Sequence, residues 1–313
     1  MSGVDPPNHE EDRYYEEPST SPPISCLPPE LLIRIFFTFQ SLHDAGNFYQ
    51  WTSILQISQS WRDLVLGTSS LWGGIMQVYS DRLLHWAVVS LERSGSAKLD
   101  VNIYMEHSTE SICNFILEVL SQIHRIRSLK LTIGAWFGSF DAPKQLRLLH
   151  LLESPAPSLE EVQLEGRGLD SFWAQEAHER PLTPIFSGSA PRLRMISLWS
   201  LPLSLKGFSC TTLVNLVLGC IEPFAYLIHL DEVLSILRTS PNIESLAFNH
   251  CPFTMSSSSV AITPISLPRL RKLELHLLAE ASVALLSHLS LPSTAHAFFT
   301  PSAELYRPLA DSL

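Results

Sequence analysis

The chain has 313 residues, of which 45% are hydrophobic and only 17% are charged, so it can bury a sizeable core. A globally disordered chain is therefore excluded. The formal net charge of −10 opposes attraction to nucleic-acid phosphates and to anionic lipid, and neither is an expected partner. The five cysteines form no C-x-x-C pair, and no secretory leader or membrane-spanning stretch is evident, which favours an intracellular location, cytoplasmic or nuclear.

The first 78 residues divide into two parts. Residues 1–24 combine five prolines with a run of carboxylates and are expected to form a disordered acidic tail. Beyond them, apolar residues recur at helical spacing in three successive stretches, 27–39, 54–65 and 71–75. Two prolines at the start of the first stretch suit the first turn of a helix. Residues 25–78 are therefore predicted to be a compact module of three short helices.

A strand pattern replaces the helical one beyond residue 97. The pattern L-x-x-L-x-L, with Ile, Val or Phe allowed for Leu, recurs six times. Its copies begin at Ile126, Leu159, Leu193, Leu213, Ile243 and Leu270. Spacings of 20 to 34 residues predict leucine-rich-repeat-like units with helical connectors over residues 97–290. The alternative is the set of parallel strands of an ordinary α/β domain, which the absence of a Gly-rich phosphate loop disfavours.

No residue pattern typical of an enzyme or a metal site is evident. His250 and Cys251 form the only adjacent His/Cys pair, but a nucleophile also needs a third group to orient the histidine, so Cys251 is expected to be a buried thiol. The other histidines lack metal-ligand spacing. Glu160, Glu161 and Glu165 surround one predicted strand and are interpreted as a solvated face. We expect a non-enzymatic protein with no catalytic residue, no cofactor and no metal.

The helical module resembles a known family. It reads L-P-P-E-L-L-I-R-I-F at 27–36, I-S-Q-S-W-R-D-L at 57–64 and S-L-W-G-G-I at 70–75. In content and order these segments are similar to the F-box, in the form common in fungal proteins. The sequence departs from that form at Gln59, where a basic residue or Cys is frequent, and in a longer stretch over residues 39–50.

The resemblance implies a docking role. F-boxes bind the Skp-type adaptor of cullin–RING ubiquitin ligases, and proteins that join an F-box to leucine-rich repeats typically hold a protein substrate on the repeats. The implied adaptor-binding residues are Leu27, Pro28, Leu31, Leu32, Ile35, Trp61, Leu71 and Trp72. Among them, Pro28, Leu31 and Ile35 are expected to be exposed apolar side chains that fit a groove on the partner.

Alternation along each predicted strand indicates which residues could meet a substrate. If the Leu positions point inward, the interleaved residues form an exposed sheet face. The substrate-binding candidates on this face are Glu161, Gln163, Met195, Trp199, Asn215, Asn249, Lys272 and His276. Trp199 stands out because Trp is enriched at binding hot spots, although it could equally cap the edge of the core.

The predicted fold class is therefore α+β to α/β, with a three-helix F-box-like module (25–78), an irregular leucine-rich-repeat solenoid (97–290) and an irregular C-terminal tail (291–313). The predicted function is the substrate-recognition subunit of an SCF-type ubiquitin ligase, which binds the Skp adaptor, through it the cullin, and a protein substrate. One alternative is a leucine-rich-repeat scaffold, outside any ligase, whose helical module is only an N-terminal cap. A DNA-binding module is disfavoured, because Arg34 and Arg62 are the only basic residues between positions 25 and 80.

Overall fold

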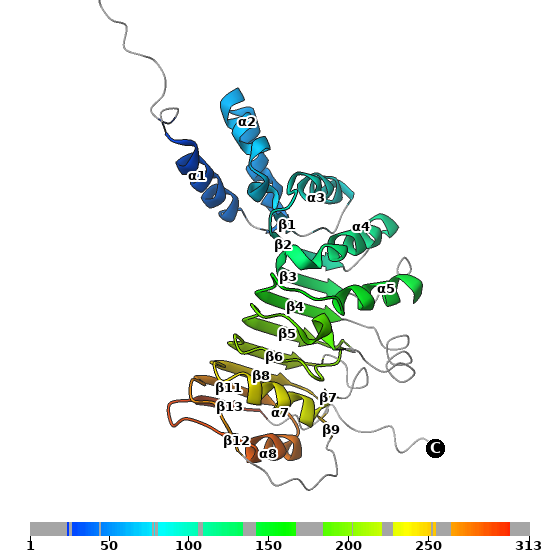
Figure 1. Cartoon of the computed structure of the whole chain (residues 1–313), viewed down its shortest axis with the longest axis vertical. Coiled ribbons are helices and arrows are strands. Elements are labelled where there is room, and N and C mark those ends of the chain that lie inside the picture. The colour runs from blue at the N-terminus through cyan, green and yellow to red at the C-terminus, as the bar shows by residue number, and fades with distance from the viewer. Residues whose placement is uncertain are drawn as a thin grey trace, which may run out of the picture.

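The computed structural model describes residue 24 and residues 27–43, 45–76, 78, 81–105, 109–133, 142–166, 184–201, 203–220, 228–251, 253–254 and 264–300. Figure 1 shows a stack of strands with helices beside it and a helical segment at the end that holds the first elements of the chain. The expected acidic tail, apart from Ile24, and residues 301–313 lie outside the described residues. No helix within the described ranges is both long and apolar enough to cross a membrane.

The N-terminal helical segment comprises α1 (Pro29–Ser41), η2 (Ala45–Gln56), α2 (Gln59–Gly67) and η3 (Ser69–Trp72), where η marks a 3-10 helix. Pro29 occupies the first turn of α1, where a missing amide hydrogen breaks no helical hydrogen bond. Ser58 caps α2, since its Oγ accepts a hydrogen bond from the backbone N of Trp61 at 3.1 Å. Gln40 Nε2 donates to the carbonyl oxygen of Leu71 at 3.1 Å, which ties α1 to η3.

Nine parallel strands form one sheet, and their order in the sheet follows their order in the chain. They are β1 (Gly74–Met76), β2 (Leu99–Met105), β3 (Ile126–Ile133), β4 (Glu161–Gly166), β5 (Met195–Trp199), β6 (Asn215–Gly219), β8 (Ser245–Asn249), β11 (Lys272–His276) and β13 (His296–Phe299). Outside this sheet, two short parallel pairs join β7 (Ile228–His229) to β9 (Phe253–Thr254) and β10 (Ile265–Ser266) to β12 (Leu289–Ser290).

Helices occupy several connections between the strands. They are α3 (Asp81–Arg93), α4 (Glu110–Ser121), α5 (Ala142–Leu152), α7 (Leu230–Thr239) and α8 (Ala279–Ser287), with 3-10 turns η4 (Ile123–Arg125) and η5 (Ile185–Gly188). Figure 1 shows α3, α4 and α5 stacked beside the strands that they connect. The middle helix, α4, lies against both of its neighbours and buries seven residues between Ile112 and Leu120, which anchors this layer of helices to the core.

Two rows of apolar side chains run across the inner face of the sheet. The first row is Ile75, Val101, Leu129, Val162, Ile196, Leu216, Leu246 and Leu273. The second row is Ile103, Leu131, Leu164, Leu198, Leu218, Phe248 and Leu275. Every member is at most 7% exposed. In six strands these rows are the second and third positions of L-x-x-L-x-L, because residues two apart on a strand point to the same face.

The fold is α/β, and the predicted fold class of a three-helix F-box-like module followed by an irregular leucine-rich-repeat solenoid is wrong. The N-terminal segment has two α-helices, and the third expected helix is a single 3-10 turn that leads into β1. Gly73 explains the change, since a Cβ there would lie 2.4 Å from the carbonyl oxygen of Lys98. Glycine allows this close approach, and Gly73 O accepts a hydrogen bond from Asp100 N at 2.9 Å. Strand β1 thereby joins the sheet beside β2.

The last described strand lies in the stretch expected to be irregular. Residues 296–299 form β13, which pairs with β11 from His296 opposite Lys272 to Phe299 opposite Leu275. All four residues of β13 are exposed. The sheet therefore continues beyond the predicted end of the repeats, at residue 290, with a strand whose side chains are not covered by the described residues.

Candidate functional site

The face of the sheet opposite the apolar rows, termed the open face, carries three rows of mostly polar side chains. The row nearest the amino ends of the strands is Asp100, Ser128, Glu161, Met195, Asn215, Ser245 and Lys272. The middle row is Asn102, Lys130, Gln163, Ser197, Val217, Ala247 and Glu274, and the row nearest the carboxyl ends is Tyr104, Thr132, Glu165, Trp199, Gly219, Asn249 and His276. All but Ser197, Ala247 and Gly219 are exposed or half-buried, so this face offers a polar binding surface.

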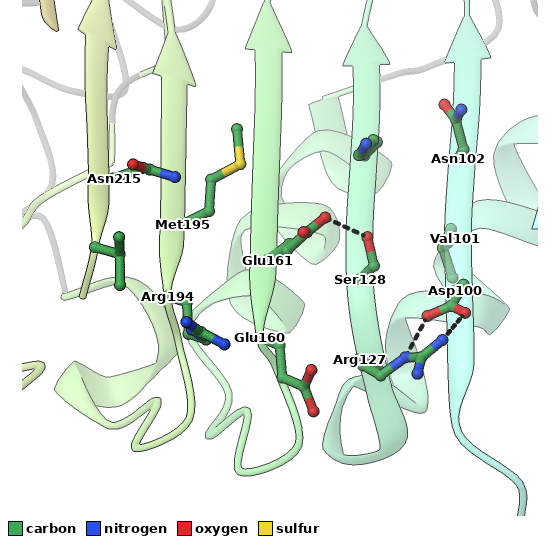
Figure 2. Close-up of a pocket in the computed structure, with 12 residues that line it drawn as sticks. Asp100, Val101, Asn102, Arg127, Ser128, Glu160, Glu161, Arg194, Met195 and Asn215 are labelled. Carbon is green, nitrogen blue, oxygen red and sulfur yellow. Dashed lines mark hydrogen bonds and ion pairs between the residues drawn. The ribbon is translucent and has the colours of Figure 1, made fainter. Parts of the chain in front are cut away.

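A depression of about 550 Å³, the amino-end groove, lies on this face across β2 to β6 (Figure 2). Its floor includes Glu161, Met195 and Asn215 from three neighbouring strands. Its rim includes Arg127 and Arg194, which directly precede the first-row residues of β3 and β5. Both charge signs line the groove, as expected for a surface that binds a polar partner rather than an apolar one.

Charged contacts hold the β2 side of the groove in place. The guanidinium of Arg127 donates two hydrogen bonds to the carboxylate of Asp100, one of them from Nε to Oδ1 at 2.9 Å (Figure 2). This pairing raises the pKa of Arg127 above its ordinary value. Next to it, Ser128 Oγ donates to Glu161 Oε2 at 3.4 Å. The two contacts orient side chains from three successive strands, which lowers the entropy that a partner must remove on binding.

Trp199 lies on the open face, in the fifth strand of the nine, rather than at an edge of the apolar core. Its Nε1 donates to Ser197 Oγ at 3.0 Å, and its ring lies against the backbone of Gly219 on the neighbouring strand. The ring is half-buried, and Ser197 beneath it is only 4% exposed. Trp199 therefore presents a fixed aromatic surface among polar neighbours, the kind of side chain that anchors binding partners.

The structure places all eight predicted substrate-binding residues on the open face, in three groups. Glu161, Met195 and Asn215 line the amino-end groove. Trp199, Asn249 and His276 share the row nearest the carboxyl ends. Gln163 lies in the middle row, and Lys272, farther along the sheet, pairs with Glu274 on its own strand at 2.7 Å. The candidates thus share a face but do not converge on one point.

Sequence reasoning missed Asp100, Arg127 and Arg194 as groove residues. A signal was present, because Arg127, Glu160 and Arg194 each directly precede an aligned first-row residue. In the structure these positions form a ladder, with Glu160 N donating to Arg127 O at 2.7 Å and Arg194 N donating to Glu160 O at 2.8 Å. Aligning the residue before the first-row position of each strand would have shown charges of alternating sign at the amino-end edge of the sheet.

The predicted adaptor-binding residues divide into exposed and buried sets. Pro28, Leu31 and Ile35 are exposed, as expected for residues that could meet a partner. Leu27 and Trp61 are half-buried, and the Trp61 ring lies 5.0 Å from that of Phe36. Leu32, Leu71 and Trp72 are at most 5% exposed and belong to the core. The last three can support the binding surface but cannot contact an adaptor without rearrangement.

Exposed large apolar side chains lie in two regions of the described chain. Near its C-terminal end they are Leu278, Val283, Phe298 and Phe299. Between residues 24 and 57 they are Ile24, Leu31, Ile35, Phe37, Leu42 and Ile57, with exposures from 39% to 75%. On α1, Leu31 and Ile35 are one helical turn apart, next to the buried stripe formed by Leu32 and Phe36. Helix α1 therefore has two adjoining apolar stripes, of which the described part of the chain covers one.

The other chemical groups considered from the sequence are structural. Burial raises the pKa of the Cys251 thiol to about 12, and its Sγ donates to the carbonyl oxygen of Leu218 at 3.2 Å. This thiol is therefore protonated at neutral pH and is not an activated nucleophile. Among the residues that the structure describes, no three His, Cys, Asp or Glu side chains are placed to hold a metal ion.

The fold and the open face define a class of structure, a parallel α/β sheet with one polar face available for binding. No protein-family model matches the chain, and no curated protein matches it. Function must therefore be inferred from the two surfaces described above, the exposed stripe of α1 and the open face.

Proposed function

We propose that this chain is the substrate-recognition subunit of an SCF-type cullin–RING ubiquitin ligase. The N-terminal helical segment binds a Skp-type adaptor, and the open face of the sheet binds a protein substrate. The observation that carries the proposal is the exposed apolar stripe of α1, formed by Leu31 and Ile35, in the segment whose sequence resembles the F-box. This role implies an intracellular location, cytoplasmic or nuclear.

The exposed stripe of α1 has the geometry of a helix that lies in a partner's groove. Leu31 and Ile35 are 44% and 41% exposed and lie at i and i+4, the spacing by which such helices insert their anchors. Other residues of α1 attach the helix to the rest of the chain. Leu32 and Phe36 are at most 5% exposed, and Gln40 donates a hydrogen bond to Leu71 O. A rigidly mounted helix loses little freedom on binding, which favours affinity.

The open face supplies the substrate side of the proposal. The amino-end groove supplies oriented charges, and the half-buried ring of Trp199 supplies an aromatic anchor. This combination is typical of protein-binding surfaces. In this role the chain contributes proximity: it raises the concentration of substrate near a ubiquitin-loaded enzyme and supplies no acid, base or nucleophile of its own.

The test is co-purification with a fungal Skp-type adaptor. Wild type should form a one-to-one complex, and the double variant Leu31→Glu/Ile35→Glu should weaken it at least tenfold, because two buried carboxylates in an apolar groove are unfavourable. Val283→Glu is the matched control, since Val283 is an apolar residue of α8 that is 68% exposed and distant in sequence. Thermal unfolding of each variant checks that the fold is intact.

A second candidate function is a protein-binding scaffold in which the helical segment only caps the β1 end of the sheet. The burial of Leu71, Trp72 and Ile75 at that end favours it, together with the Arg93 guanidinium 5.3 Å from the Trp72 ring. Absence of adaptor binding by the folded wild-type chain would select this scaffold function and reject the ligase role.

A further inference from the structure

A second depression, of about 620 Å³, overlaps the amino-end groove, with which it shares Glu160, Arg194 and Val214, and is formed by residues that precede β4, β5, β6, β8 and β11. Three arginines line it, Arg192 and Arg194 before β5 and Arg269 before β11. We call it the arginine depression. The proposed function assigns no role to Arg192 or Arg269.

The charge of this depression is uncompensated. Its two carboxylates already have partners, since Glu160 lies 3.7 Å from Lys98 Nζ and Glu244 lies 3.6 Å from Arg271. The guanidinium groups of Arg192, Arg194 and Arg269 are exposed and make no ion pair or hydrogen bond with any described residue. Three positive groups thus remain available in one hollow of a chain whose net charge is −10.

The strands set the spacing between these charges. The backbone ladder runs from Arg194 O to Val214 N, from Val214 O to Glu244 N and from Glu244 O to Arg271 N, each at 2.8 Å. These three steps between neighbouring strands cover roughly 14 Å at about 4.8 Å each. Arg192 and Arg269 lie two residues before Arg194 and Arg271, the two ends of this ladder, so the turns that hold them are the same three steps apart. An extended peptide advances about 3.4 Å per residue, so the same distance corresponds to about four residues.

We propose that the arginine depression binds an extended peptide that crosses the amino ends of β5 to β11 and carries two anionic side chains about four residues apart. Guanidinium groups bind carboxylate and phosphate alike through paired hydrogen bonds, so glutamate, aspartate and phosphoserine share the required chemistry. The inference rests on the proposed function, because it names the class of substrate segment that the sheet holds.

A peptide fits the surroundings better than a nucleic acid. Glu160 and Glu244 lie in the depression, and a polyphosphate backbone would carry its charges past both carboxylates. Between the arginines, Asn242 donates its Nδ2 hydrogen to Thr211 O at 2.9 Å, and its amide oxygen has no donor among the described residues. That oxygen can accept a hydrogen bond from a peptide N–H, whereas the sugar–phosphate backbone of DNA offers no hydrogen-bond donor.

The test measures the binding of fluorescent nine-residue peptides to the full chain without adaptor, by anisotropy. One peptide carries two glutamates four residues apart, a second carries phosphoserines there, a third carries adjacent glutamates and a fourth carries glutamines. The spaced anionic peptides should bind at least tenfold more tightly than the glutamine peptide and more tightly than the adjacent pair. Arg194→Gln and Arg269→Gln should each weaken binding about three- to fivefold, as expected for exposed ion pairs.

Arg82→Gln is the matched control, because Arg82 is an exposed arginine of α3 outside the depression, and it should leave binding unchanged. The relative affinities of the glutamate and phosphoserine peptides show whether the depression prefers carboxylate or phosphate side chains. Equal binding of the glutamine and glutamate peptides, insensitivity to both arginine variants, or tighter binding of a single-stranded oligonucleotide would overturn the inference. Adaptor binding is measured separately, so its loss alone counts only against the ligase role.

Discussion

The Trp199 ring occupies the space that a side chain at Gly219 would need. A Cβ added to Gly219 would lie 2.2 Å from Cε3 of Trp199, closer than any van der Waals contact allows. The two residues are direct neighbours in the pairing of β5 with β6. Glycine is required here because a bulky ring covers this position of the neighbouring strand, and no unusual backbone angle is involved.

Gly219→Ala should therefore force the Trp199 ring off the sheet and destabilise the protein by about 1 to 3 kcal/mol. Urea unfolding followed by circular dichroism measures the change. Gly67→Ala is the control, because a Cβ there meets nothing within 4 Å, and it should be neutral or slightly stabilising.

A double-mutant cycle separates the ring contact from other effects of the new methyl group. In a Trp199→Ala background the cost of Gly219→Ala should fall close to zero, because the clashing ring is gone. An unchanged cost in that background would show that the ring contact is not its cause.

Substitutions in the apolar rows of the inner face and in the polar rows of the open face should differ sharply in their cost to the free energy of unfolding. Leu216→Ala and Leu273→Ala each remove a side chain that is 0% exposed and should cost about 2 to 5 kcal/mol. Gln163→Ala and Ser245→Ala on the open face should stay within about 0.5 kcal/mol. Chemical unfolding of all four variants measures this, and similar losses in both sets would mean that the two faces have been exchanged.

Arg125 should act as a structural cation. It is 8% exposed and its guanidinium donates to Ser94 Oγ at 3.1 Å and, through Nε, to Gln122 Oε1 at 2.8 Å. Arg125→Met leaves the buried Ser94 Oγ and the half-buried Gln122 Oε1 without this donor and should cost about 1 to 3 kcal/mol. Arg82→Met on the surface of α3 should be nearly silent in the same unfolding assay, and equal effects would contradict a role for the buried hydrogen bonds.

Cys251 should make stability fall at high pH. Its thiol has a pKa of about 12 in the folded chain against an ordinary value of 9.0, so above pH 9 the unfolded chain releases a proton that the folded chain retains. The free energy of unfolding should then decrease by about 1.4 kcal/mol per pH unit between pH 9 and 12 through this group. Cys251→Ser, which does not titrate there, should show a shallower decline, and parallel pH curves for the two proteins would rule out the contribution.

The repeated pattern predicted the parts of the fold that depend on local alternation. The inward positions of Leu216 and Leu273 follow from the two-residue period of a strand, and the structure buries both. The spacing of apolar residues in 71–75 predicts a helix, but so few residues fit the period of a strand as well. Whether these residues form a helix or lead into a strand depends on the close approach of Gly73 to Lys98, which lies 25 positions away in the sequence.

The candidate site shows the same limit. Alternation placed Glu161 and Met195 on the open face, but it gave no information about neighbours across strands. The pairing of Arg127 with Asp100 depends on the irregular register between β2 and β3, where the pairing shifts between Leu99 and Asp100. A shift of this kind arises from packing between elements, so a single sequence could not show which charges meet.

The matching order of strands in the sheet and in the chain also bears on synthesis at the ribosome. Each new strand of the main sheet finds its hydrogen-bonding edge on the previous strand of the same sheet, from β1 through β13. No pairing in this sheet has to wait for a partner from a distant part of the chain, so a nascent strand spends little time with an unpaired backbone edge facing its predecessor. Growth of the sheet can keep pace with translation, one strand at a time.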